Sequence, residues 1–157
     1  CAVDFTKGSD RAVRQALQLV KGGGRLTLVH VSRAAGLGVA THGYNLAVPE
    51  YAHRLHHDAW RRMRDAVPIE ARMVADIRAR VTSGAPATEI TRVASELDAD
   101  LIVMGVTARG VVGRTLIGST VARVIRTAGR PVLAVPERLS KRLDVHMAPE
   151  RRPRLAA

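Results

Sequence analysis

The segment from Leu101 to Ala128 limits the possible folds most, because it predicts a buried strand, a glycine-containing loop and a helix in direct succession. The strand begins with four consecutive apolar residues (Leu-Ile-Val-Met), which is typical of a parallel strand covered on both faces. The helix begins near Gly118, and its apolar residues recur at helical spacing and predict one buried stripe: Val121, Val124, Ile125 and Ala128. The basic residues around this stripe are expected to face the solvent: Arg123, Arg126 and Arg130.

The loop lies at the carboxyl end of this predicted strand, which is where open α/β sheets bind their ligands. Its glycines, beginning with Gly105, let backbone N–H groups approach an anion closely. The helix start at Gly118-Ser119-Thr120 adds unpaired N–H groups and the positive end of a helix dipole. The segment therefore predicts an anion-binding loop, although turns and helix caps need the same residue types and explain the pattern equally well.

The rest of the chain alternates between strand and helix patterns. Residues Ala2 to Asp4 have the character of the end of a strand, so we expect the first strand to be truncated at its N-terminus in this sequence. A helix capped by Ser9 or Asp10, a strand over 25–31 and a long loop over 32–49 are predicted next. They are followed by a helix over 50–66, a strand closing at Ser83-Gly84 and a helix that begins with Pro86. The strand and helix of the segment described above come next, and a strand over 131–136 ends the series. Residues 70–75 are compatible with either a helix or the start of a strand.

This order predicts one α/β domain over residues 1–136, with a doubly wound, five-stranded, mostly parallel sheet and helices on both faces. Prolines at both ends of the last strand predict that it lies at an edge, because proline donates no hydrogen bond to a ladder. Residues 137–157 contain six basic residues and two prolines but few large apolar ones. They are expected to form a basic, mobile tail.

Composition narrows the classes of function. The net charge is +11, but the arginines are dispersed, which is typical of solvated helix faces rather than of a nucleic-acid surface. Aromatic residues make up 3% of the chain, too few for platforms that stack single-stranded nucleic acid. No apolar run approaches the roughly 18 residues that span a bilayer. The single cysteine, Cys1, excludes an internal disulfide and favours a reducing, cytoplasmic compartment.

Two strand ends face a common crevice in such a fold, and they carry Asp4 and Gly105. The Asp4 carboxylate is able to accept hydrogen bonds from a base amino group or from ribose hydroxyls. The loop and the amides of Ser119 and Thr120 are placed to hold phosphates. This combination predicts a nucleotide site; the alternative is that Asp4 and Ser119 serve only a turn and an N-cap.

Several short stretches resemble the universal stress protein family in their order and spacing. They are Ala2-Val3-Asp4-Phe5, Leu28-Val29-His30-Val31, Gly84-Ala85-Pro86-Ala87, Ala99 to Gly105, and Gly118-Ser119 leading to Arg130-Pro131-Val132-Leu133-Ala134-Val135. The resemblance covers about residues 2 to 136. It implies an adenine nucleotide alpha hydrolase-like, Rossmann-like fold and a homodimer, for which the edge from Val132 to Val135 is a natural pairing surface.

In the ATP-binding branch of that family, the loop reads Gly, two residues, Gly, nine residues, Gly and then Ser or Thr. Here the spacing is intact, but Ala108 replaces the second glycine. The resemblance implies that its methyl group lies where backbone and phosphate approach each other, and alanine tolerates a positive φ poorly. By resemblance the cofactor is ATP, with or without Mg²⁺, and the implied contacts are Asp4 and Val31 at the adenine or ribose, Gly105 at the ribose, and Ala108, Gly118, Ser119 and Thr120 at the phosphates.

The resemblance thus implies a stress-response regulatory domain that binds ATP with little or no turnover. Two alternatives stay open. One is a dimeric scaffold of the same family that binds no nucleotide, which Ala108 favours. The other is a slow ATPase or phosphotransferase that modifies Ser119. No Ser/His/Asp or Cys/His set and no paired carboxylates point to hydrolytic catalysis.

The helix predicted over 50–66 carries His53 and His57 one turn apart, a spacing that suits a metal ion. Both lie opposite the apolar stripe of that helix and among arginines, which would repel a cation. A solvated face is therefore the favoured interpretation, and no metal is expected. Trp60 is predicted to pack within the helix interface.

Overall fold

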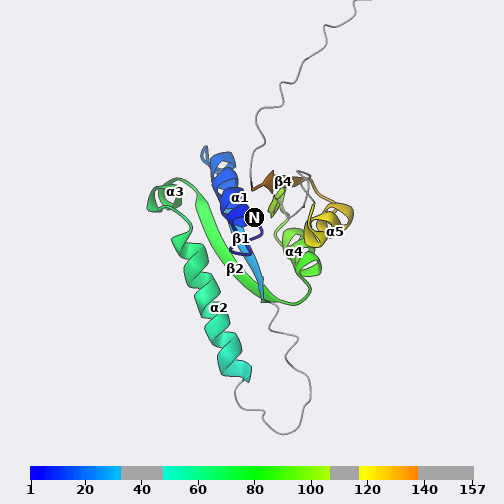
Figure 1. Ribbon diagram of the computed structural model, residues 1–157. Coiled ribbons are helices and arrows are strands. Elements are labelled where there is room, and N and C mark those ends of the chain that lie inside the picture. Colours follow the sequence, from blue (N-terminus) through cyan, green and yellow to red (C-terminus); the bar gives the residue numbers. More distant parts are fainter. Residues whose placement is uncertain (33–47, 107–116, 138–157) are drawn as a thin grey trace, which may run out of the picture.

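The structure is a computed structural model that describes residues 1–32, 48–106 and 117–137, and for residues 48–53 and 55 it describes the backbone alone. Helices and strands alternate along the chain, except that two helices follow the first complete strand (Figure 1). In chain order they are α1 (Lys7–Leu19), β1 (Arg25–Ser32), α2 (Val48–Asp65), α3 (Ile69–Val74), β2 (Asp76–Ser83), α4 (Pro86–Glu96), β3 (Ile102–Val106), α5 (Ser119–Thr127) and β4 (Val132–Pro136). Most of the predicted long loop and of the predicted tail falls outside the described residues.

The paired segments of the described sheet all run parallel, in the order β2, β1, residues 1–3, β3, β4. Residues 1–3 join the two pairs of strands, because Ala2 forms a bridge with Val29 of β1 on one side and with Met104 of β3 on the other. The Val3 N–H donates to the Val29 carbonyl at 2.8 Å, and the Ala2 N–H donates to the Val103 carbonyl at 2.9 Å. The predicted five-stranded parallel sheet is confirmed, with its first strand reduced to one bridge residue.

Helices cover both faces of this sheet, as a doubly wound fold requires. α1 and α2 pack over one face, and α4 and α5 pack over the other. The first core is formed by Val3, Ala12, Val13, Ala16, Leu26, Leu28, Met63, Val67 and Val103, and the second by Ala87, Ile90, Ala94, Ile102, Met104, Val106, Val121 and Val124. The sheet therefore lies between two separate apolar layers.

The region from residue 69 to residue 83 contains both elements that its sequence allowed. It begins with the short helix α3 and continues into β2, whose side chains Ile77, Ala79 and Val81 pack against the first core. Pro86 opens α4 at a position where the missing N–H costs nothing, as predicted.

The predicted boundaries around α1 and the long loop are wrong. α1 begins at Lys7 because Thr6, rather than Ser9 or Asp10, caps it, and the Thr6 hydroxyl accepts a hydrogen bond from the Ser9 N–H at 3.3 Å. Ser32 belongs to β1 and Val48 already belongs to α2, so the connection between them is shorter than predicted.

Two predictions for α5 and the turn after it are also wrong. Ile125 is 48% exposed, because the second core covers α5 only along Val121 and Val124. Arg130 is half-buried rather than fully solvated. Its guanidinium donates to the Ala99 carbonyl at 2.6 Å and to the Asp98 carboxylate at 2.9 Å, which ties the turn before β4 to the turn before β3.

The end of α2 differs from the prediction in its buried side chains. Ala66 lies beyond the last turn and is exposed, and Val67 takes the expected place in the core. Trp60 is 46% exposed rather than packed in the interface, and the Arg64 guanidinium lies 5.6 Å from its ring centroid. None of the helices in the described ranges combines the length and hydropathy that a bilayer span needs.

Candidate functional site

A cavity of about 160 Å³ opens at the carboxyl end of the sheet. Four of the residues predicted for the ligand site line it: Asp4, Val31, Gly105 and Thr120. They come from separate parts of the chain, namely the turn after residue 3, β1, β3 and the first turn of α5. The structure therefore brings together residues that are up to 116 positions apart in the sequence. Their role as ligand contacts stays a prediction.

The Asp4 carboxylate is fixed by the turn that follows it. Its Oδ1 atom accepts hydrogen bonds from the Thr6 hydroxyl at 2.6 Å and from the Thr6 N–H at 3.1 Å. Desolvation alone would raise the pKa of this carboxyl, but the hydrogen bonds from Thr6 outweigh that effect and hold the pKa below its ordinary value. Asp4 is therefore anionic at neutral pH and is an acceptor at the edge of the cavity. The turn role that the sequence left open is also present.

Gly105 is required by packing, independently of any ligand. A Cβ atom at this position would lie 2.3 Å from the Gly8 carbonyl carbon, 2.4 Å from the Gly8 oxygen and 2.5 Å from the Ser9 nitrogen. The first turn of α1 therefore rests directly on the backbone of β3, an approach that only glycine permits. This contact also sets the position of α1 beside the cavity.

α5 begins beside the cavity without a side-chain cap. Its N-cap is Gly118, so the alternative in which Ser119 is the N-cap is wrong. The first N–H groups of a helix have no partner within the helix, and here they start next to the lining residues Thr120 and Val121. A Cβ atom on Gly118 would meet nothing within 4 Å, so packing does not demand glycine there. This end of α5 is suited to an anionic group of a ligand.

The remaining predicted residues are not part of the cavity wall. Gly118 and Ser119 are exposed and immediately precede Thr120. Ala108 lies outside the described residues. The phosphate part of the predicted site is thus described only at its α5 side.

The cavity walls are otherwise mainly apolar, with Val29, Ile90 and Met104 among them. Pockets for drug-sized ligands occupy roughly 300–1,000 Å³, so this cavity holds one ring system rather than a whole dinucleotide. An apolar slot lined by a carboxylate acceptor and by the first turn of a helix fits a planar base joined to an anionic group.

Sequence reasoning missed the residues that orient Asp4. Thr6 could have been found, because an Asp followed two positions later by Thr at the end of a strand is typical of a side-chain-bonded turn. Phe5 could not, because its φ of 61° lies in a region that bulky residues rarely adopt. Thr6 bonds Asp4 through its hydroxyl and its N–H, and Phe5 lies between the two residues in the turn.

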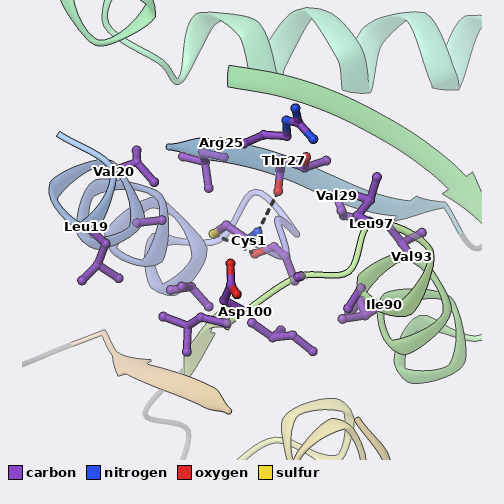
Figure 2. Close-up of a pocket in the computed structure, with 18 of the residues that line it drawn as sticks. Cys1, Leu19, Val20, Arg25, Thr27, Val29, Ile90, Val93, Leu97 and Asp100 are labelled. Carbon is purple, nitrogen blue, oxygen red and sulfur yellow. Dashed lines mark hydrogen bonds between the residues drawn. The ribbon is translucent and has the colours of Figure 1, made fainter. Parts of the chain in front are cut away.

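A larger cavity of about 410 Å³ lies at the opposite, amino end of the strands (Figure 2). Its walls include Val20, Val93 and Leu97, and the Cys1 amino group donates within it to the Thr27 carbonyl at 2.7 Å. None of the predicted site residues lines it. Because open parallel sheets bind ligands at the carboxyl ends of their strands, the smaller cavity is the candidate site.

The part of the chain that the structure describes contains no group of three or more His, Cys, Asp or Glu side chains placed to share a metal ion. His57 is exposed on α2, and the side chain of His53 is not among those described.

Comparison with known proteins agrees with this architecture. The model of the universal stress protein family matches residues 1–136. The chain belongs to the universal stress protein family. Universal stress protein G of Shigella flexneri is 32% identical to it over 127 residues, which cover 81% of this chain and 88% of that relative.

Solved structures of the universal stress protein fold also align with the chain. The structure of the protein MJ0577 aligns with a TM-score of 0.69 at 21% identity. The alignment covers 88% of this chain and 94% of MJ0577, and it supports the assignment of the fold. A universal stress protein in complex with cAMP aligns with a TM-score of 0.55 at 26% identity, over 87% of this chain and 94% of its own. That relative binds a cyclic nucleotide.

Proposed function

We propose that this chain is a cytoplasmic stress-response domain that binds an adenine nucleotide, with ATP and Mg²⁺ as the first candidate, and turns it over slowly or not at all. The observation that carries this proposal is the convergence of Asp4, Val31, Gly105 and Thr120 on one cavity. Membership of the family and the cAMP complex of a relative support it. The domain is proposed to span residues 1–136.

Each part of the nucleotide has a matching group in the chain. The base lies between Val31 and the other apolar walls, and Asp4 accepts hydrogen bonds from its amino group or from the ribose. Gly105 lies beside the ribose. The phosphates extend toward the N-terminus of α5, where the proposed contacts are Ala108, Gly118, Ser119 and Thr120.

Titration calorimetry with Mg-ATP tests this proposal directly. We expect measurable heat and a higher melting temperature, because a ligand at 100 times its Kd stabilises the native state by about 2.7 kcal/mol. Mg-GTP serves as the matched control, since its base presents a different donor and acceptor pattern and is expected to bind more weakly. If millimolar Mg-ATP gives neither heat nor a thermal shift, the nucleotide proposal is wrong. If binding occurs only after Ala108→Gly, the scaffold alternative is correct.

We also propose a homodimer through β4, at the described edge of the sheet. The Ile102 N–H donates to the Pro131 carbonyl at 3.0 Å, and the Glu137 N–H donates to the Val106 carbonyl at 2.9 Å. In a parallel ladder this register uses the odd-numbered residues of β4, so the N–H groups of Val132 and Ala134 point away from β3. Such outward groups are available to a second edge strand.

Ala134→Pro is expected to convert the dimer to a monomer at micromolar concentration, because proline removes an outward donor while the bonds to β3 remain. Light scattering coupled to size-exclusion chromatography measures the mass, and circular dichroism verifies the fold. Ala134→Val is the control, since it keeps the N–H group and should remain dimeric. A wild-type protein that is monomeric at all concentrations, or an undisturbed dimer of Ala134→Pro, contradicts this interface.

A further inference from the structure

Side chains on the face of the sheet that α1 and α2 cover anchor the turn that carries Asp4. Phe5 follows Asp4 with a φ of 61°, a conformation that persists in a bulky residue only when its surroundings impose it. The Phe5 ring lies against the His30 ring, with 4.6 Å between their centroids. The guanidinium carbon of Arg62, on α2, lies 3.9 Å from the Phe5 ring centroid. We refer to Arg62, Phe5 and His30 as the Phe5 clamp.

His30 ties the Phe5 clamp to the first strand of the sheet. The His30 Nδ1 atom lies 2.8 Å from the Val3 carbonyl oxygen. A carbonyl oxygen only accepts, so Nδ1 donates, and the His30 ring is held against the residue that precedes Asp4. Phe5 also packs at the border of the first core. The ring of Phe5 is therefore restrained from α2 and from β1 at the same time.

Arg62 covers the Phe5 ring from α2. Arg62 is exposed on α2 and does not line the candidate cavity. Its contact with Phe5 is a cation–π interaction, in which the flat guanidinium covers the ring face. The neighbouring Arg61 is also exposed and is not part of this cation–π contact, so it is a natural control.

We propose that the Phe5 clamp is a positioning device for the nucleotide site: Arg62 and His30 hold Phe5 in its left-handed backbone conformation, and this keeps the Asp4 carboxylate bonded to Thr6 at the edge of the cavity. The part of this inference that concerns ligand affinity rests on the proposed function. The part that concerns the orientation of Asp4 does not. Arg62 and Phe5 are therefore positioning residues that act through Asp4.

The first experiment compares Arg62→Ala with Arg61→Ala, and it measures the pKa of the Asp4 carboxyl by carbon-13 NMR in the absence of ligand. Arg62→Ala is expected to raise this pKa toward its ordinary value, because the hydrogen bonds from Thr6 that lower it become less well held. Arg61→Ala removes the same charge from the same helix and should leave the pKa unchanged. Arg62→Lys keeps the charge without the flat stacking surface, so it should resemble Arg62→Ala.

The second experiment measures Mg-ATP affinity for the same variants. Loss of the cation–π contact is expected to weaken binding about 2- to 5-fold in Arg62→Ala, and Arg61→Ala should bind as the wild type does. Phe5→Tyr keeps the aromatic ring and should also match the wild type. Phe5→Ala removes the ring and leaves a residue that disfavours a positive φ, so it should show the raised Asp4 pKa.

The two readouts separate the clamp from the proposed function. If the wild type binds no nucleotide, the proposed function fails, and the Asp4 pKa alone decides whether the clamp positions this carboxylate. If the pKa of Asp4 is the same in wild type, Arg62→Ala and Phe5→Ala, the clamp has no positioning role, whatever the affinity data show.

Discussion

Replacing Gly105 by alanine is expected to destabilise the protein by about 3 kcal/mol, at the upper end of the usual cost of overpacking. The added methyl group would lie 2.3–2.5 Å from backbone atoms of Gly8 and Ser9. Backbone in the first turn of a helix has no rotamer to change, so α1 must move as a unit away from β3. The midpoint of urea unfolding, at an unchanged slope, measures this loss.

Gly22→Ala is the matched control for this substitution. Gly22 follows α1, and a Cβ atom there would meet nothing within 4 Å. Its alanine variant should be neutral or up to about 1 kcal/mol more stable, because alanine restricts the unfolded chain. If the free energy of unfolding of Gly105→Ala falls by less than about 1 kcal/mol, α1 moves away from β3 at little cost, and the close contact does not require glycine at this position.

The Gly105 contact changes how the glycines of this loop are interpreted. The sequence offered one reason for a glycine after an apolar strand, which was close approach to an anion. The structure supplies a second reason, which is close approach of a helix. The presence of glycine at this position therefore does not by itself demonstrate a ligand, and the Asp4 and Thr120 side chains give the site its chemical character.

Local patterns were sufficient to predict the sheet. The unbroken apolar run before Gly105 marked a strand buried on both faces, and the proline that opens α4 marked a helix boundary. The order of these elements then placed Asp4 and Gly105 at one edge, because parallel strands of a doubly wound sheet end together. The likeness to the universal stress protein family pointed to the same pair.

Features that depend on contacts between distant residues could not be predicted from the same patterns. Arg130 has the spacing of a solvated residue, but its partner is a carboxylate 32 positions away in the sequence. The left-handed conformation of Phe5 is imposed by Arg62 and His30, and no local propensity favours it. Periodicity reports which face of an element is apolar, and it carries no information on which polar group meets which.

Asp4→Ala is expected to weaken nucleotide binding by about 10- to 100-fold, because a hydrogen bond to a charged acceptor contributes about 1.5–3 kcal/mol. The turn holds Asp4 with Oδ1 already bonded to Thr6, so little ordering of this side chain remains to be done when the ligand binds. Calorimetry with Mg-ATP on both proteins measures the loss. The same substitution should leave the fold intact, because Asp4 is exposed.

Asp100→Ala is the matched control, since Asp100 is also exposed but lines the larger cavity at the opposite end of the strands. It should bind Mg-ATP as tightly as the wild type does. The reverse outcome, in which Asp100→Ala loses binding and Asp4→Ala keeps it, would move the ligand to the amino end of the sheet. That result would show that the ligand does not bind in the smaller cavity, although the strands end there and Asp4, Gly105 and Thr120 converge on it. Equal affinity in all three proteins would show that neither carboxylate contacts the nucleotide.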